Sequence, residues 1–385
     1  MKSIRKIAVA MSGGVDSAVS ALILKKRGYD VMGVYMANWN MYDEQGHCSG
    51  EQDYLDAEKA ASLIGIPLRR VSFEKEYWTQ VFSQLLDGYE NGITPNPDIL
   101  CNKHIKFGAL FDYAINTLKV DWLATGHYAK LQYSRNGPRS PTDEGQRPQQ
   151  GSDFSSSVKC EKSLRKTLFP VGDILKSDVK KLAEKSGLIH FAEKKESFGI
   201  CFIGNRKFKD FISEYISTPP GVMVDIDTGR RVCKHKGIHL WTLGQCIHQP
   251  SQSSAYYVCD INPASNIIYV AAGRNHPSLD CHQIFCAKPH WISGRHQKLM
   301  KTHQVLVCDV RTRHRANFTK CNIMFFGDKG KLVVDLAEPI SGLVAPGQYA
   351  VFYDGNECLG SAMIVGKDKY EPRKQFQNNE ICHSL

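Results

Sequence analysis

Two features of the sequence combine residue types that could do chemistry: a glycine-containing loop near its start and two cysteines about one hundred residues apart. The loop Ser12–Ser17 (SGGVDS) follows the apolar run Lys6–Met11 and precedes a helical pattern. Its two glycines allow a tight turn that presents backbone N–H groups at a helix N-terminus, where phosphate is favoured. The alternative is a plain turn in which Asp16 and Ser17 cap the helix. No Walker A motif occurs in the sequence, so a Walker-type NTPase is disfavoured.

Cys101 and Cys201 lie in segments that single them out from the thirteen cysteines of the chain. Cys101 ends the proline-rich run TPNPDILC, which we expect to be a loop leading into a helix that starts near Ile105. A thiol beside a helix N-terminus and Lys103 is expected to be partly ionised. Cys201 lies between the glycines of GICFIG. Taken alone, each cysteine favours an inert buried thiol, because free cysteine packs as a small hydrophobic side chain.

The elements that must position these residues alternate between strands and helices. The expected strands are Lys6–Met11, Val31–Met36, Pro67–Phe73 and Trp122–Thr125. The expected helices are Ser17–Arg27, Tyr54–Ile64, Tyr77–Tyr89 and Ile105–Leu118. This alternation predicts an α/β fold in which helices cover both faces of a parallel sheet, and ligands of such sheets bind beyond the carboxyl ends of the strands.

The remainder of the chain has a different texture. Residues 131–163 are rich in Ser, Pro, Gln and Gly and predict a flexible insertion, followed by a helix at Lys176–Lys185. Beyond Gly221, short alternating runs separated by turns predict a small β-rich domain and then a β-barrel. We therefore expect three domains, at residues 1–204, 205–278 and 279–385, with a flexible tail after about residue 366.

The composition excludes several classes of protein. The 385 residues are 42% hydrophobic, as in a globular protein. No apolar run approaches the ~18 residues that would cross a membrane, and the first residues do not predict a secretory signal. An odd cysteine count argues for reduced thiols rather than a disulfide scaffold. Cys281 and Cys286 have no second such pair and no C-x-x-C occurs, so no metal site formed by cysteines is predicted.

The net charge of +10 is concentrated in two windows. Residues 156–210 hold 13 basic and 7 acidic side chains, and residues 274–315 hold 8 and 2, so each window has a net charge of +6. Localised basic charge of this kind predicts a polyanionic partner such as RNA. The alternative is that these charges lie on solvated helix and loop faces.

The motifs SGGVDS, PNPDILCN, GHYA and GICFIG together resemble the tRNA-specific 2-thiouridylases. The bacterial and mitochondrial enzymes of this family replace the C2 oxygen of the anticodon wobble uridine of tRNAs for Lys, Glu and Gln with sulfur. The resemblance extends from Lys6 to about Val365 through KGIHLWTLGQ, RTRHR and PGQYAVFY, and it looks closer to animal mitochondrial members than to bacterial ones. It implies an adenine nucleotide alpha-hydrolase-like first domain, and a mitochondrial location or, for a bacterial protein, a cytoplasmic one.

The resemblance also implies the roles of individual residues. Cys201 would carry sulfur as a persulfide loaded by a cysteine desulfurase or sulfur-relay protein, Cys101 would be the partner nucleophile, and Asp98 the general acid/base. ATP, assisted by Mg²⁺, would be bound by Ala10, Met11, Ser12, Gly13, Gly14, Val15, Asp16, Ser17, Met36 and Gly126. The tRNA would be contacted by Asn96, Pro97, Asp98, His127, Arg313, His314 and Gln348, the first three around a flipped-out base. The alternatives for Met36, Gly126 and Asp98 are a core methionine, a turn glycine and a turn-capping carboxylate.

Two departures from the family pattern affect the expected tRNA-binding contacts. The Asp/Lys-Asp-Gln segment that normally follows GHYA is replaced by the Ser/Pro-rich residues 131–163, and Cys246 stands where an Arg usually follows the Gln of LGQ. Two alternative functions therefore stay open. One is another pyrophosphate-loop adenylating ligase, which would need no cysteine pair, and the other is a tRNA-binding relative without catalytic turnover.

Overall fold

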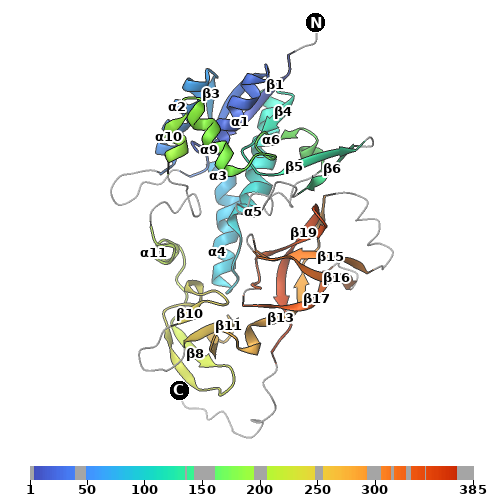
Figure 1. Ribbon diagram of the computed structural model, residues 1–385. Coiled ribbons are helices and arrows are strands. Elements are labelled where there is room, and N and C mark those ends of the chain that lie inside the picture. The colour runs from blue at the N-terminus through green and yellow to red at the C-terminus, as the bar shows by residue number, and fades with distance from the viewer. Residues whose placement is uncertain are drawn as a thin grey trace.

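The computed structural model describes residues 4–39, 49–134, 137–142, 161–194, 206–247, 255–292, 305–313, 316–326, 331–342 and 344–370. Its strands form three sheets, one parallel and two mainly antiparallel (Figure 1). Of the predicted site residues, Cys201 and His314 lie outside this described part of the chain. So does most of the tail expected after residue 366, although β19 extends to Lys367.

The first sheet is parallel throughout, which confirms the predicted fold class. Its strand order is β3-β2-β1-β4-β7. The strands are β1 (Lys6–Met11), β2 (Asp30–Ala37), β3 (Leu68–Ser72), β4 (Trp122–Ala124) and β7 (Thr167–Leu168). Because the order changes direction at β1, a crevice opens where the carboxyl ends of β1 and β4 diverge, and such switch points are where α/β sheets bind ligands.

Helices cover both faces of this sheet, and successive residues of β1 point into the two different cores that result. Ile7, Val9 and Met11 pack into one core, and Ala8 and Ala10 pack into another. The first core includes residues of α1 (Val15–Lys26), α2 (Ser49–Ile64), α9 (Lys176–Lys185) and α10 (Ile189–Glu193). The second includes residues of two longer helical runs. Within the described residues, no helix has both the length and the apolar character needed to cross a membrane.

The two longer runs mix α-helical and π-helical turns. The first consists of α3 (Glu74–Tyr77), the π-helical η1 (Trp78–Phe82) and α4 (Ser83–Glu90). The second consists of α5 (Pro97–Cys101), the π-helical η2 (Asn102–Ala109), α6 (Leu110–Asp112) and the π-helical η3 (Tyr113–Thr117). The prediction that this second helix starts near Ile105 is wrong. Asn96 caps the helix and Pro97 occupies its first turn, where its fixed φ and missing N–H cost nothing.

Part of the expected flexible insertion is ordered, which corrects that prediction. Strands β5 (Lys130–Ser134) and β6 (Gly137–Thr142) form an antiparallel hairpin, and α8 (Glu161–Leu164) follows. Thr142 of β6 pairs with Glu357 of β19. Backbone pairing with this distant strand therefore stabilises the hairpin, although its local composition predicts no packed element. The remainder of the insertion, residues 135–136 and 143–160, lies outside the described residues.

The second half of the chain is β-rich, as predicted. After α11 (Phe208–Ser213), a central sheet contains β8 (Gly221–Asp225), β9 (Arg231–His235), β10 (Cys246–Ile247), β11 (Tyr256–Asn262) and β12 (Ile267–Ala272). Six strands then form a barrel that is closed by the pairing of β13 with β19. They are β13 (Asp280–Cys286), β15 (Leu306–Arg311), β16 (Thr319–Phe326), β17 (Lys331–Ser341), β18 (Tyr349–Asp354) and β19 (Glu357–Lys367), with the short β14 (His290–Trp291) alongside β19.

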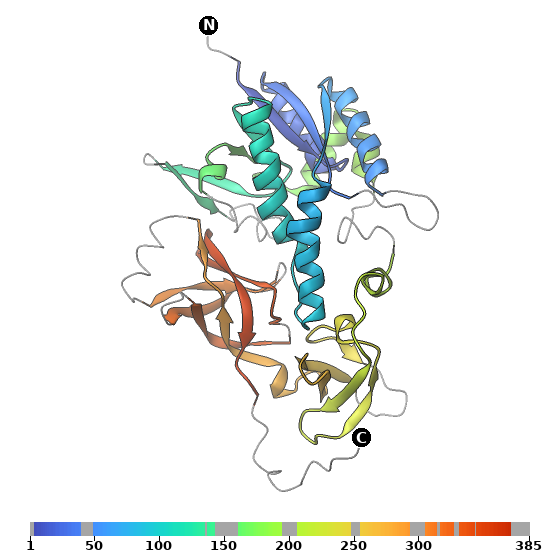
Figure 2. The ribbon, with the colours of Figure 1, turned by 180° about the vertical axis from the view of Figure 1, so that it is seen from behind.

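The helix α4 points from the parallel sheet toward the two β-rich parts, and its far end lies near both of them (Figures 1 and 2). The loop that joins α4 to α5 is therefore held close to the central sheet and to the barrel. Since α5 carries Asp98 and Cys101, this arrangement places the predicted catalytic helix next to both of the other parts.

Candidate active site

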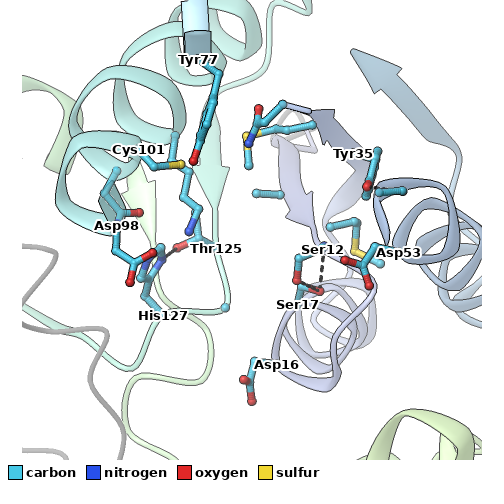
Figure 3. A pocket seen from close by; sticks show the side chains of 18 of the residues that line it. Ser12, Asp16, Ser17, Tyr35, Asp53, Tyr77, Asp98, Cys101, Thr125 and His127 are labelled. Atoms are coloured by element: carbon cyan, nitrogen blue, oxygen red, sulfur yellow. Dashed lines mark hydrogen bonds between the residues drawn. The ribbon is translucent and has the colours of Figure 1, made fainter. Parts of the chain in front are cut away.

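A cavity of about 480 Å³ opens at the carboxyl ends of β1, β2 and β4, where the sheet topology predicts a ligand. Figure 3 shows its two walls facing each other across an open space. One wall carries Ser12, Ser17, Tyr35 and Asp53, and the other carries Tyr77, Asp98, Cys101, Thr125 and His127. The cavity therefore brings the phosphate-loop motif and the PNPDILC motif together, although about ninety residues separate them in the sequence.

The turn after β1 has the geometry expected of a phosphate-binding loop. Ser17 Oγ accepts from the Ser12 N–H at 3.2 Å and donates to the Gly14 carbonyl at 2.9 Å, which fixes the turn. Gly13 has a φ of +72°, and a Cβ added there would lie 2.4 Å from the Asp53 carbonyl oxygen, so only glycine fits. Gly14 is the N-cap of α1, without a side-chain cap. Asp16 and Ser17 therefore do not supply the N-cap of α1, and the binding of phosphate by this turn stays a prediction.

The predicted nucleotide residues divide into two groups. Gly13 and Gly14 of the turn and Val15, the first residue of α1, do not line the cavity. Those that line the cavity are Ala10, Met11, Ser12, Asp16, Ser17, Met36 and Gly126. Met36 and Gly126 thus lie at the strand ends where the family resemblance expects nucleotide contacts.

Two lysines that the sequence analysis did not single out neutralise the carboxylates beside the loop. Asp16 accepts hydrogen bonds from Tyr128 Oη and Lys176 Nζ, both at 2.6 Å. Lys194 Nζ donates to Asp53 Oδ1 at 3.1 Å. These lysines lie more than 140 residues from the aspartates that they contact, so local sequence patterns gave no sign of the pairs.

Lys194 also forms an ion pair with a buried carboxylate behind the loop. Its Nζ lies 2.6 Å from Asp56 Oδ2, and His190 Nε2 lies 3.3 Å from Asp56 Oδ1. Burial by itself would raise the pKa of Asp56, but the hydrogen bonds and charges of Lys194 and His190 outweigh burial and lower it. Burial would lower the pKa of Lys194, but its two aspartate partners raise it. The pair is therefore charged and holds the chain just after α10 against α2, which carries Asp56.

The opposite wall is one face of the helix that begins at Pro97. Asp98, Cys101, Asn102 and Lys106 all line the cavity from this face. Cys101 is 8% exposed and lies in the second turn, not in a loop before the helix. Asn102 and Lys106 were missed by the sequence analysis, and their positions four and eight residues after Asp98 were the signal that could have identified them.

Asp98 has the properties of a group that exchanges protons. Its side chain is open to the cavity, yet the surrounding walls withdraw enough water to raise its pKa, and the positive charge of Lys106 opposes this shift only in part. A carboxyl group with a raised pKa in a cavity is a candidate acid or base. On the same wall, His127 Nδ1 lies 2.7 Å from Thr125 Oγ1, and both of these side chains are buried.

Replacing Asp98 with asparagine is expected to raise the melting temperature, by an amount that grows as the pH rises from 4 to 7. The folded protein binds the Asp98 proton more tightly than the unfolded chain does, so ionisation of this group lowers stability as the pH passes its ordinary value. Asparagine has no proton to lose. Thermal unfolding against pH measures the effect, with Asp112→Asn, an exposed position on the same helical run, as the control. A lower melting temperature at pH 7 would contradict the raised pKa.

The predicted tRNA residues do not all lie at the cavity. Asp98 and His127 line it, whereas Asn96 and Pro97 lie at the start of the helix beside it. Gln348, from the turn before β18, hydrogen-bonds to Asn96 at 3.2 Å. Arg313 follows β15, is exposed, and is not among the residues that line the cavity.

Comparisons with known proteins match the whole chain. Family models match residues 5–205 (tRNA methyl transferase HUP domain), 209–272 (tRNA methyl transferase PRC-barrel domain) and 281–364 (Aminomethyltransferase beta-barrel domain). The Drosophila melanogaster protein named Mitochondrial tRNA-specific 2-thiouridylase 1 is 45% identical over 372 residues, which cover 94% of each chain. Proteins of the same name from Danio rerio and Homo sapiens are 40% and 37% identical. Those alignments cover 100% and 95% of this chain and 97% and 91% of the relatives.

Proposed function

Because this chain belongs to the family of mitochondrial tRNA-specific 2-thiouridylases, we propose that it uses ATP to replace the C2 oxygen of a tRNA wobble uridine with sulfur. The observation that carries the proposal is the cavity, in which the predicted phosphate-binding loop faces a carboxyl group and a thiol. An adenylating sulfurtransferase needs these groups within reach of one substrate atom. The expected substrates are the tRNAs for Lys, Glu and Gln, and the expected location is the mitochondrion.

The first step is the activation of uracil C2. A uracil carbonyl is a poor electrophile because its oxygen cannot leave as oxide. Transfer of AMP from ATP to this oxygen, with release of pyrophosphate, turns the oxygen into a good leaving group. The loop from Ala10 to Ser17 would hold the phosphates through backbone N–H groups at the N-terminus of α1, and Met36 and Gly126 would contact the nucleotide.

Mg²⁺ is expected from the family resemblance; the described residues contain no group of three or more His, Cys, Asp or Glu side chains that could hold a metal, but two carboxylates beside the loop line the cavity. Asp16 and Asp53 both line it, and Mg²⁺ in nucleotide sites is held by one or two carboxylates together with phosphate oxygens. These two residues would hold the ion, which would neutralise phosphate charge when bound. Lys176 and Lys194 orient the two carboxylates and limit their repulsion of the nucleotide.

The second step is sulfur transfer. The terminal sulfur of a Cys201 persulfide attacks C2, and AMP leaves with the former C2 oxygen. The Cys101 thiolate then attacks Sγ of Cys201, which releases the sulfur on C2 as the thiocarbonyl and leaves a Cys101–Cys201 disulfide. The two thiols supply the two electrons that reduce the transferred sulfur, so a dithiol reductant must reopen the disulfide. Asp98 would exchange protons with the base during these steps.

The tRNA is proposed to bind across all three parts of the chain. Asn96, Pro97, Asp98 and His127 would surround the flipped-out uridine, and Arg313, His314 and Gln348 would contact the tRNA from the barrel. The two basic windows, 156–210 and 274–315, supply the positive charge that a phosphate backbone requires. We keep 1–204, 205–278 and 279–385 as the proposed catalytic, central and barrel domains. A cysteine desulfurase or sulfur-relay protein is the proposed donor to Cys201.

Mass spectrometry of tRNA nucleosides tests substrate and reaction together. Unmodified tRNA for Lys, incubated with the protein, ATP, Mg²⁺ and a persulfide donor, is expected to gain 2-thiouridine at the wobble position and to release one pyrophosphate per sulfur. Omitting ATP is expected to abolish the product. Pyrophosphate release without 2-thiouridine would favour another adenylating ligase, and tRNA binding without either would favour a non-catalytic relative.

A further inference from the structure

The loop between α4 and α5 is the place where the three parts of the chain meet. Thr94 Oγ1 lies 2.6 Å from Thr242 Oγ1, which belongs to the turn before β10 of the central sheet. From the barrel, the Pro346 carbonyl accepts the Thr94 N–H at 2.9 Å. Gln348 Nε2 donates to the Thr94 carbonyl at 2.8 Å. This short loop is thus fastened on one side to the central sheet and on the other to the barrel.

Close packing shows that the junction is built into the fold. A Cβ added at Gly347, which has a φ of +91°, would lie 2.4 Å from Ile93 Cγ2 and 2.8 Å from the Thr94 carbonyl oxygen. A Cβ added at Gly88 of α4 would lie 2.2 Å from Pro95 Cγ. Real Cβ atoms do not approach so closely, so glycine is required on both sides of the loop. The backbone of residues 93–95 is therefore confined by its neighbours.

Both the oxygen and the nitrogen of the Gln348 side-chain amide form hydrogen bonds. Its Oε1 accepts from Asn96 Nδ2 at 3.2 Å, while its Nε2 donates to the Thr94 carbonyl and lies 3.4 Å from the Pro95 carbonyl oxygen. This pattern requires one acceptor and one donor at fixed places, which among side chains of this length only an amide supplies. A carboxylate at this position would face two carbonyl oxygens without a proton to share.

Asn96 connects Gln348 to the helix that lines the cavity. Its Oδ1 accepts the Ile99 N–H at 3.2 Å as the helix cap, while its Nδ2 donates to Gln348. One side chain thus joins the barrel to the helical turn that carries Asp98, one turn before Cys101. A loss of the cap would loosen this turn first, because the first four N–H groups of a helix have no partner within it.

We propose that Gln348 and Thr242 are positioning residues, which hold the α4–α5 loop so that Asp98 and Cys101 keep their places in the cavity. The inference rests on the proposed function, and it adds to Gln348 a task that is separate from contact with tRNA. Thr242 tests that separation, because its hydroxyl is used on Thr94.

The first experiment is single-turnover thiolation at saturating tRNA. Gln348→Glu is expected to lower the rate at saturating tRNA by ~10- to 100-fold, as misplacement of a reacting group by about 1 Å does, whether or not the Kd for tRNA also changes. Gln84→Glu, on the exposed face of α4, is the matched control and is expected to be neutral. A weaker Kd with an unchanged saturated rate would overturn the proposal and leave Gln348 as a tRNA contact alone.

The threonine pair supplies a second set of variants. Thr94→Val or Thr242→Val alone leaves one hydroxyl without its partner, whereas the double variant replaces the pair by an apolar contact of the same shape. Each single variant is expected to slow thiolation severalfold, and the double variant is expected to recover at least half of that loss. Additive losses in the double variant would contradict a direct Thr94–Thr242 interaction.

Hydrogen exchange separates this inference from the proposed function. In Gln348→Glu, amides at the start of the helix, including that of Ile99, are expected to exchange at least tenfold faster than in the wild type, while α1 keeps its exchange rates. This readout needs no substrate. Absence of 2-thiouridine with the wild-type protein would reject the proposed function but not the positioning role of Gln348. Unchanged exchange near Ile99 would reject the positioning role alone.

Discussion

Replacing Cys101 with serine is expected to reduce wobble-uridine thiolation by on the order of 10³- to 10⁶-fold, the loss typical when a catalytic nucleophile is removed. A serine hydroxyl cannot attack the mixed disulfide between Cys201 and the base, so sulfur would stay bound to the enzyme. ATP-dependent pyrophosphate release is expected to continue for one turnover, because the phosphate loop lies on the opposite wall of the cavity (Figure 3). Product analysis and pyrophosphate release, measured on the same sample, separate the two steps.

The controls for this prediction come from the other cysteines. Cys201→Ser is expected to abolish thiolation to the same extent, whereas Cys233→Ser, at a half-buried position in β9, is expected to leave it unchanged. Normal thiolation in the Cys201 variant would contradict the persulfide mechanism. Activity that survives Cys101→Ala would instead favour an adenylating ligase, whose chemistry needs no cysteine pair.

Replacing Gly126 with alanine is expected to lower pyrophosphate release by ~10²-fold, because the substitution displaces the phosphate loop. A Cβ at this position would lie 2.8 Å from both the Asp16 carbonyl carbon and the Ser17 nitrogen. Both are backbone atoms at the start of α1, so no side-chain rotation can relieve the overlap. The end of β4 and the phosphate loop would have to separate, and the loop N–H groups would move away from the nucleotide.

The matched control for Gly126→Ala is Gly366→Ala in β19. There the new methyl group would meet only Phe285 Cδ2 at 4.0 Å, an ordinary contact, so activity and melting temperature are expected to stay near those of the wild type. Equal pyrophosphate release by the Gly126 and Gly366 variants would contradict the assignment of Gly126 to the nucleotide site.

Local patterns in the sequence predicted four of the five strands of the parallel sheet closely, and missed the two-residue β7. The strand expected at Lys6–Met11 and the helix expected at Lys176–Lys185 have those bounds in the structure. Apolar runs and the glycines that follow helices are short-range signals, so they survive without knowledge of the fold. The start of the α5 helix was missed because two prolines were interpreted as a loop, although Asn followed by Pro is a typical N-cap and first helical residue.

The ordered hairpin in the expected insertion shows the opposite case. Strands β5 and β6 have a composition that predicts no packed element, and one of them pairs with β19, more than 200 residues away. Backbone hydrogen bonds do not depend strongly on side-chain type, so an edge pairing of this kind leaves little trace in a single sequence.

The sequence by itself determined which chemical groups this protein has: a glycine-containing loop, a carboxyl group and two thiols in distinctive motifs. Each of these groups lies in a short motif, and the local conformation of a short motif follows largely from its residue types. Only the tertiary structure decided how these groups are held. The pairing of Asp16 with Lys176 and of Asp53 with Lys194, and the bond from Gln348 to Asn96, join residues more than 100 positions apart. Such contacts depend on how the elements pack, which short-range patterns do not encode.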